Sequence, residues 1–262
     1  MSVLLCIAML LEPMVVFAER ITTSDEPLAV IYAASDFQVK KSDGTDDYDT
    51  AKSVMNKIIK SVKANHKRMD GAFFLGDYSV KYNQPYTDAG RTAVKEVLTG
   101  AWSNLKGGNI IYVQGNHDDS AFTGQETSKT QSFKHYNVFV MDEDDFPWQQ
   151  GKSGADKRET VVQTAANLES FLQGRVDAND SRPVFIASHI PLHYSKRSNS
   201  GWNYDNTYSK LIFDVLNEYG KKLNIIYLFG HNHSAASDNY IGGAAAYLGR
   251  GDTMYVSKYG DP

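Results

Sequence analysis

Residues 109–118 read Asn-Ile-Ile-Tyr-Val-Gln-Gly-Asn-His-Asp, and this stretch decides the fold because it joins an apolar strand to a chemically active turn. The run at 109–114 predicts a buried strand. The residues Gly115-Asn116-His117-Asp118 that follow carry amide, imidazole and carboxylate groups, which serve as ligands and proton carriers in metal-dependent hydrolases. The stretch therefore predicts a strand with chemistry at its carboxyl end.

Four other places along the chain repeat this arrangement of an apolar strand followed by polar groups. The predicted strands and the residues after them are Leu28 to Ala34 with Asp36, Gly71 to Leu75 with Gly76-Asp77, Pro183 to Ser188 with His189, and Asn224 to Phe229 with Gly230-His231-Asn232-His233. Apolar residues spaced three and four apart predict amphipathic helices over residues 51–62, 93–105, 161–172 and 208–219. Because the carboxyl ends of parallel strands meet at one edge of a sheet, this α/β pattern predicts a site at that edge.

The remaining segments have weaker patterns. Tyr136 to Met141 predicts a strand, residues 119–131 a polar loop beside the site, and residues 142–158 a surface insertion. Near the end of the sequence, residues 249–252 predict a turn and Thr253 to Val256 a strand with no helix after it. Such an end suggests that the sequence is truncated at its C-terminus.

The ordered motifs together resemble the calcineurin-like metallophosphoesterase superfamily, over residues Leu28 to Tyr240. The resemblance implies a four-layer αββα sandwich with the metal site at the carboxyl ends of the strands. It also implies a phosphoesterase that hydrolyses phosphomonoesters or phosphodiesters with a hydroxide bridging two divalent metal ions. Manganese, iron and zinc are the ions that we expect from this resemblance.

The resemblance also implies a role for each residue of the motifs. Asp77 would bridge the two ions. Asp36 and His233 would complete the ligands of the first ion, and Asn116, His189 and His231 those of the second. His117 would be the general acid that protonates the leaving group, and Asp118 would orient it.

Each of these residues has another reading when it is taken alone. An Asp after a strand is commonly a turn former or a helix cap. A lone His is more often hydrogen-bonded in the core or at the surface than a metal ligand, which is our reading of His66 and His135. The combination of motifs favours the metal site, since Gly76, Gly115 and Gly230 fit a backbone that turns sharply close to an ion.

Gln38 departs from the family pattern, which usually reads Asp-x-His where this chain has Asp36-Phe37-Gln38. A glutamine oxygen is a harder and weaker ligand than a histidine nitrogen, so it suits manganese, magnesium or calcium better than zinc. Gln38 is therefore a candidate ligand of a weakened first site. The chain also lacks the tyrosine that purple acid phosphatases need three residues after the bridging Asp, because Val80 stands there.

Composition narrows the class of protein and its location. The 262 residues carry a net charge of −4 with no basic block, so neither nucleic acid nor an anionic membrane is an expected partner. Residues 1–18 combine an apolar run with small residues at Val16-Phe17-Ala18, which predicts a cleavable signal peptide, a secreted protein and one domain over residues 19–262. The run is too short for a stable membrane anchor. If residues 1–18 are a buried segment instead, the protein is cytoplasmic.

Two alternative functions stay open from the sequence. One is a non-catalytic, metal-stabilised binding domain whose first site is degenerate at Gln38, although a purely structural site has no use for the general acid His117. The other is a cytosolic phosphodiesterase or nuclease of the same superfamily. In each catalytic reading the partner is a small-molecule or polymeric phosphoester, whose identity and whose monoester or diester nature the motifs leave open.

Overall fold

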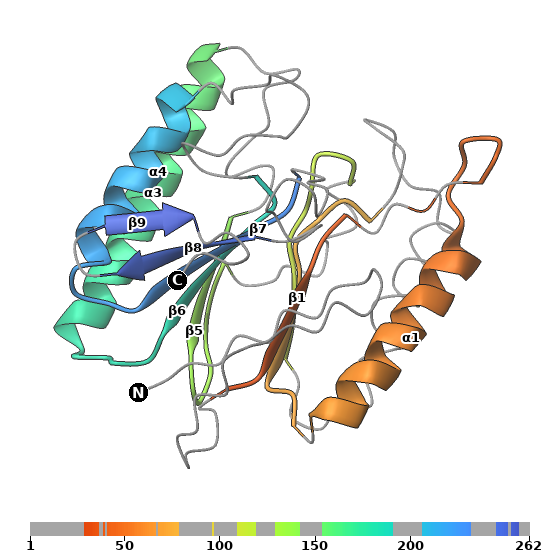
Figure 1. Ribbon diagram of the computed structural model, residues 1–262. Helices are drawn as coiled ribbons and strands as arrows, with labels where there is room; N and C mark the ends of the chain where they lie inside the picture. Colours follow the sequence, from red (N-terminus) through yellow and green to blue (C-terminus); the bar gives the residue numbers. More distant parts are fainter. Residues whose placement is uncertain are drawn as a thin grey trace.

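Two sheets, each covered by helices on its outer face, organise the part of the chain that the structure describes (Figure 1). The structure is a computed structural model, and it describes residues 29–36, 39, 41–66, 68–78, 96, 109–118, 129–141, 154–190, 206–231, 245–250 and 253–256. The elements in chain order are β1 (Ile31–Ala34), α1 (Tyr48–Asn65), β2 (Gly71–Phe74), β3 (Asn109–Tyr112), β4 (Thr130–Ser132), β5 (Asn137–Met141), α3 (Gly154–Asp177), β6 (Val184–Ser188), α4 (Asn206–Tyr219), β7 (Ile225–Phe229), β8 (Ala245–Arg250) and β9 (Thr253–Val256).

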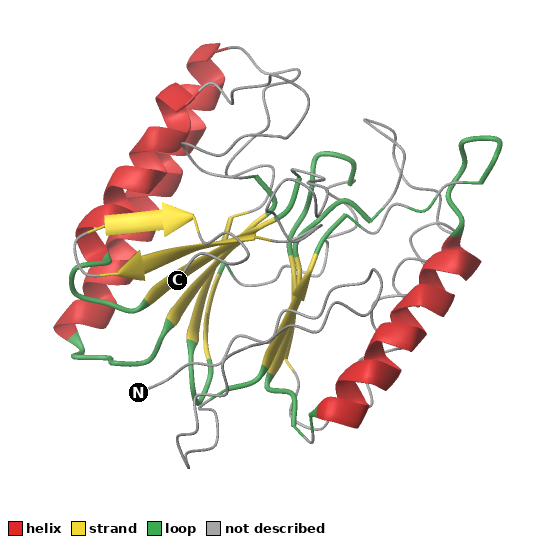
Figure 2. Ribbon diagram, in the orientation of Figure 1, coloured by secondary structure: helices red, strands yellow, loops and turns green. Residues whose placement is uncertain are grey.

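The two sheets differ in their strand directions. The first has the order β1-β2-β3, and all three of its strands are parallel. The second has the order β4-β5-β6-β7-β8-β9. Its centre, β5-β6-β7, is parallel, and antiparallel strands pair on both sides of this centre. As Figure 2 shows, α1 flanks one sheet while α3 and α4 flank the other, which gives the four-layer αββα sandwich predicted from the sequence.

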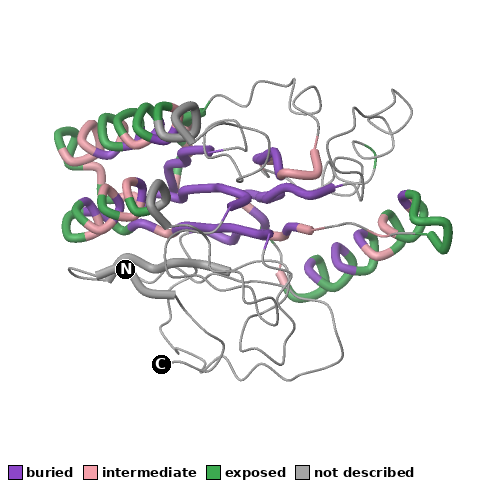
Figure 3. The backbone as a smooth tube through the Cα atoms, turned by 90° about the horizontal axis from the view of Figure 1, so that it is seen from above, coloured by how far each residue is buried: buried purple, intermediate pink, exposed green. Residues whose placement is uncertain are grey.

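Residues of the central strands alternate between two buried faces. Ile31 of β1 and Phe73 of β2 face the other sheet, in a core shared with Phe185 of β6. Their neighbours Tyr32 and Phe74 face α1 instead. Because both faces are covered, the strands are continuous apolar runs, and Figure 3 shows them as the most buried part of the chain.

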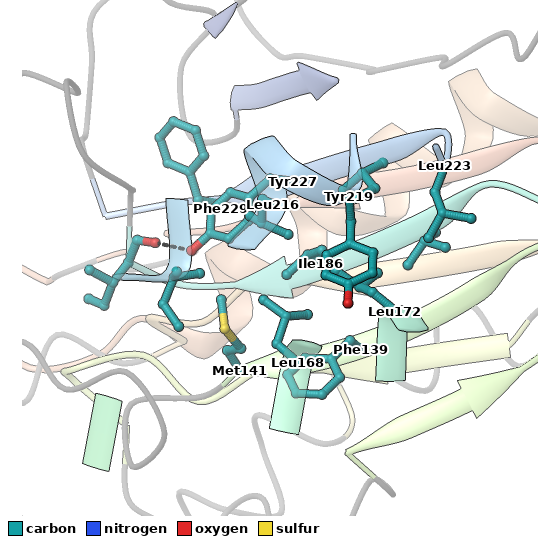
Figure 4. Packing of buried hydrophobic residues seen from close by; sticks show 14 of the residues in the cluster. Phe139, Met141, Leu168, Leu172, Ile186, Leu216, Tyr219, Leu223, Tyr227 and Phe229 are labelled. Atoms are coloured by element: carbon teal, nitrogen blue, oxygen red, sulfur yellow. Dashed lines mark hydrogen bonds between the residues drawn. The ribbon is translucent and has the colours of Figure 1, made fainter. Parts of the chain in front are cut away.

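The outer face of the second sheet packs against α3 and α4. Leu168 and Leu172 of α3 and Leu216 of α4 lie over Ile186 and Tyr227 of the sheet, as drawn in Figure 4. The buried Tyr227 hydroxyl donates to the carbonyl oxygen of Ile190 at 2.8 Å (Figure 4). This bond ties the end of β6 to β7, close to where both strands deliver polar residues.

Helix α1 begins at a conventional cap and buries one stripe against the first sheet. Asp47 is the N-cap, and its carboxylate accepts a hydrogen bond from the Thr50 backbone N–H at 3.0 Å. The buried residues Met55, Ile58, Ile59 and Val62 repeat at helical spacing. Helix α1 lies in the crossover connection between the parallel strands β1 and β2.

The structure confirms most of the expected elements and corrects some boundaries. Two strands are not among the predicted elements. Strand β4 overlaps the loop expected over residues 119–131, and β8 includes Gly249 and Arg250 of the expected turn. Helix α3 begins at Gly154, within the expected insertion. Strand β9 pairs with β8. Of the helix expected over residues 93–105, only Glu96 lies within the described residues, and it is helical.

The expected signal peptide falls outside the described residues, as do residues 142–153. Among the helices that the structure describes, none has both the length and the apolar character needed to cross a bilayer.

Candidate metal centre

Five of the predicted ligands meet where the strands of both sheets end. Asp36, Asp77 and Asn116 follow β1, β2 and β3, whereas His189 and His231 follow β6 and β7. The two sheets touch directly here, because the His189 Nε2 atom lies 3.2 Å from Asp77 Oδ1 and the His231 backbone N–H donates to Asp36 Oδ2 at 3.1 Å. The carboxyl edges of both parallel sets therefore build one site.

Four donor atoms converge at the centre of this site. His189 Nε2 lies 3.0 Å from Asn116 Oδ1 and 3.2 Å from His231 Nδ1. His231 Nδ1 lies 2.7 Å from the same Asn116 oxygen. The candidate ligand atoms of Asp77, His189 and His231 all fall within 4.8 Å of one another, and these three residues are buried.

The tautomer of His189 decides what this convergence means chemically. His189 Nδ1 lies 2.7 Å from the carbonyl oxygen of Leu75, which can only accept, so Nδ1 carries the proton. In the neutral ring, Nε2 then presents a lone pair to the oxygens of Asp77 and Asn116. Lone pairs facing one another without a proton between them repel, and a cation placed among them removes that repulsion. The donor set therefore fits a divalent metal ion.

The pKa values of the central pair follow from burial and mutual charge. Burial lowers the pKa of His189, but the adjoining Asp77 carboxylate and, less strongly, Asp36 raise it, with a net result of about 10. Burial raises the pKa of Asp77, but His189 and His117 more than offset this and hold it below its usual range. The cluster thus favours a bound positive charge, whether a proton or a metal ion carries it.

Backbone strain is concentrated at the same strand ends. Among the described residues other than glycine, φ is positive at Asp36 (58°), Asp77 (59°), Asn179 (51°) and His231 (66°). Three of these four are predicted ligands, and the left-handed conformation costs an L-residue roughly 1–2 kcal/mol. Strain that recurs at three separate strand ends is typical of a functional site rather than of a general feature of the fold.

Two glycines allow the loops of the site to approach closely. A Cβ atom added to Gly115 would overlap the Asp77 carboxylate and lie 2.5 Å from the Asp77 backbone nitrogen. One added to Gly230 would lie 2.5 Å from Ser35 Cβ and 2.8 Å from Asp36 Oδ2. Only glycine fits at these two contacts, and each of them presses the backbone of one motif against a carboxylate of another.

His117 and Asp118 lie beside the cluster. The His117 backbone N–H donates to Asp77 Oδ1 at 3.0 Å, which fixes the chain next to the predicted metal ligands. The Asp118 carboxylate accepts from the backbone N–H groups of Asp77, Tyr78 and Gly115. Burial and the Asp77 charge raise the pKa of Asp118 to about 7, although its hydrogen bonds from Gly115 and Tyr78 act in the opposite direction. The predicted role of Asp118 in orienting His117 stays a prediction.

Several predicted residues are not placed. Gln38, His233 and Val80 lie outside the described residues, so the proposed ligands of the first ion are represented by Asp36 and Asp77 alone. His66 forms the C-cap of α1, and His135 lies in the turn before β5, both outside the cluster.

Sequence reasoning missed three supporting groups. Ser35 donates its hydroxyl to Asp36 Oδ2, and its position directly before Asp36 was a usable signal. The buried Tyr78 hydroxyl lies 2.7 Å from the carbonyl oxygens of both Phe74 and Val113, bridging the ends of β2 and β3, and burial raises its pKa well above the usual value. The Leu75 carbonyl oxygen, which orients His189, leaves no mark in the sequence because any residue supplies it.

The sequence is similar to that of known phosphoesterases. Residues 29–235 match the sequence profile of the calcineurin-like phosphoesterases. Among solved structures, a purple acid phosphatase isolated from yellow lupin (Lupinus luteus) seeds matches with 13% sequence identity and a TM-score of 0.44, covering 78% of this chain and 37% of that chain. This chain thus spans little more than a third of that protein. No curated protein is significantly similar to the chain.

Proposed function

Because the chain belongs to the calcineurin-like phosphoesterase family, we propose that it is a metal-dependent enzyme that hydrolyses phosphomonoesters or phosphodiesters. The observation that carries this proposal is the meeting of Asn116 with the buried residues Asp77, His189 and His231 at the carboxyl ends of two sheets. A carboxylate, an amide oxygen and two imidazoles are a ligand set for divalent transition metals. The four side chains together support metal binding, and the proposal does not depend on any one of them.

Two divalent ions would be held by the residues of this site. Asp77 would bridge the ions, with Asn116, His189 and His231 as the other ligands of the second ion and Asp36 as a ligand of the first. His233 and Gln38 are proposed to complete the ligands of the first ion. Bound ions would supply Lewis acidity and neutralise the charge on the phosphoryl group. A glutamine ligand would make one ion exchange more easily, with manganese, iron or zinc as candidates.

His117 is proposed to donate the proton that the leaving oxygen needs. Its backbone N–H donates a hydrogen bond to Asp77 Oδ1, and this bond holds the His117 backbone beside the proposed metal ligands. Proton transfer of this kind contributes roughly 10²–10⁴-fold to the rate. The His117→Asn variant should keep its metal and lose much more activity on esters with poor leaving groups than on those with good ones. Equal losses on both kinds of ester would contradict this role.

Metal content tests the proposal directly. After dialysis, elemental analysis should show that Asp77→Ala, His189→Ala and His231→Ala each lose metal, whereas His66→Ala retains the wild-type content. Activity on an aryl phosphate and on its diester, with added manganese, should be nearly abolished in the same three variants. Wild-type metal content in all three would refute the metal centre.

A non-catalytic metal-binding domain is the second candidate function. It predicts retained metal with no turnover of either aryl ester at any manganese concentration. The presence of His117 beside the ligands favours the enzyme.

Export is a further part of the proposal. Mass spectrometry of protein recovered from its source should find a mature chain beginning after Ala18. A chain that retains residues 1–18 would favour the cytosolic phosphodiesterase or nuclease instead.

A further inference from the structure

The Asp118 carboxylate collects three backbone N–H groups from two different loops. Its Oδ2 atom accepts from Asp77 and Gly115, each at 2.8 Å, and its Oδ1 atom accepts from Tyr78 at 2.9 Å. Two of these donors are consecutive in the chain, so their N–H groups form a small concave site of the kind that binds anions. The Asp118 carboxyl group reaches these donors from as far as 41 residues further along the chain.

These donors belong to a buried and strained piece of backbone. Asp77 is 1% exposed and Tyr78 is 4% exposed, so water is no substitute partner for their N–H groups. Asp77 also has the left-handed φ of 59°. Such a conformation persists only where the surrounding contacts impose it, and hydrogen bonds to a carboxylate are among the strongest contacts available.

The loop at 115–118 holds Asp77 at two points. The Asp118 side chain binds the Asp77 backbone N–H, while the His117 backbone N–H binds the Asp77 side chain at Oδ1, 3.0 Å away. Backbone and carboxylate of Asp77 are thus both fixed by one short segment. So held, Asp77 Oδ1 lies 3.2 Å from His189 Nε2.

We propose that Asp118 is a positioning residue that locks the backbone at Asp77 so that the Asp77 carboxylate faces the metal. This inference rests on the proposed function only in taking Asp77 as a metal ligand. It differs from the role expected from the sequence, in which Asp118 orients His117. The three backbone N–H groups bond to both oxygens of the Asp118 carboxylate. An asparagine would keep one oxygen as an acceptor, but its NH₂ group would face a backbone N–H, and neither group can accept a hydrogen bond from the other.

The variant that tests this is Asp118→Asn, with Asp47→Asn as the matched control. Asp47 also accepts a backbone N–H, but at the exposed start of α1. Isothermal titration with Mn²⁺ should show an affinity about 10–100-fold weaker in Asp118→Asn, the usual cost of losing a group that supports a metal ligand, and no change in Asp47→Asn. Hydrogen exchange should accelerate at the amides of Asp77, Tyr78 and Gly115.

Unchanged Mn²⁺ affinity and unchanged amide hydrogen exchange in Asp118→Asn would overturn the proposal. The proposal is also overturned if only the dependence of the rate on the leaving group changes, because Asp118 would then act by orienting His117. If the wild type binds none of Mn²⁺, Fe²⁺ and Zn²⁺, the proposed function fails, and exchange at the three amides still decides the role of Asp118. If Asp118→Asn does not fold, Asp118→Glu replaces it: the longer side chain should give weaker Mn²⁺ binding and faster exchange, and wild-type values would overturn the proposal.

Discussion

Replacing Gly115 by alanine adds one methyl group where the loop after β3 comes closest to the loop after β2. The added Cβ atom would overlap the Asp77 carboxylate, and it would lie 2.5 Å from the Asp77 backbone nitrogen. A rotation of the Asp77 side chain would relieve the contact with its carboxylate, but the contact with its backbone nitrogen requires one of the two loops to move. Gly115 and residues 75–78 are buried, and hydrogen bonds join the two loops, so neither moves freely.

The expected cost follows from this geometry. Extra methyl groups that force backbone shifts in a packed interior cost about 1–3 kcal/mol. For a chain close to this size, 1 kcal/mol corresponds to about 2–4 °C in Tm. We therefore expect Gly115→Ala to lower Tm by about 2–12 °C. Its affinity for Mn²⁺ should fall as well, because the shift displaces Asp77.

Gly174→Ala is the matched control, measured in the same thermal unfolding experiment. Gly174 lies in α3, and an added Cβ atom would meet nothing within 4 Å. Alanine is more favourable than glycine in a helix by about 0.5–1 kcal/mol, so this variant should be slightly more stable than wild type. The reasoning is refuted if Gly115→Ala unfolds at or above the wild-type Tm while Gly174→Ala behaves as expected.

Three further outcomes are expected. Hydrogen bonds from Arg182 and, less strongly, from Asn137 hold the pKa of Asp180 below its ordinary value in the folded protein. These bonds therefore stabilise the fold fully above the unfolded pKa of about 3.9, and this stabilisation is lost as the pH falls toward the lower pKa of the folded protein. The unfolding free energy of wild type should therefore exceed that of Asp180→Asn at neutral pH, and denaturant titrations should show the difference shrinking below about pH 4. Asp47→Ala removes the cap bond to Thr50 and should cost about 1 kcal/mol in denaturant unfolding, whereas Asp47→Asn, which can still cap, should cost less. Chelation should lower the Tm of metal-loaded protein, and Mn²⁺ at 100 times its Kd should restore about 2.7 kcal/mol; a Tm independent of chelator would contradict a structural contribution from metal.

The strands that carry the site could be predicted from sequence because they are buried on both faces. Such strands are unbroken apolar runs, and the polar residue that ends each run is visible at once, as with Phe74 before Asp77. Strand β4 was not predictable in this way because its residues Thr-Gln-Ser have no apolar alternation. The first turns of α3 were missed for a similar reason, since Gly154 begins a stretch without apolar periodicity.

The assembly of the site was only partly predictable. The motifs predict the ligands and the resemblance implies two sheets, but neither predicts that the edges of these sheets meet at Asp77 and His189. The contacts of Asp118 show why local reasoning fails. Its neighbour in sequence is His117, whereas its carboxylate bonds to backbone groups 40 and 41 residues earlier in the chain. A backbone acceptor such as the Leu75 carbonyl oxygen carries no side-chain signal at all.

The bonds that assemble this centre join parts of the chain that are very far apart in sequence. The Asp36 to His231 bond spans 195 residues, and the His231 to Asn116 contact spans 115. Contacts of such long range carry the largest loop-closure cost, and they form after the local structure that brings them together. A metal ion that needs all of them therefore binds the native state and not the folding transition state. Its main kinetic effect should be to slow unfolding and to lengthen the lifetime of the folded protein, with little effect on how fast the protein folds.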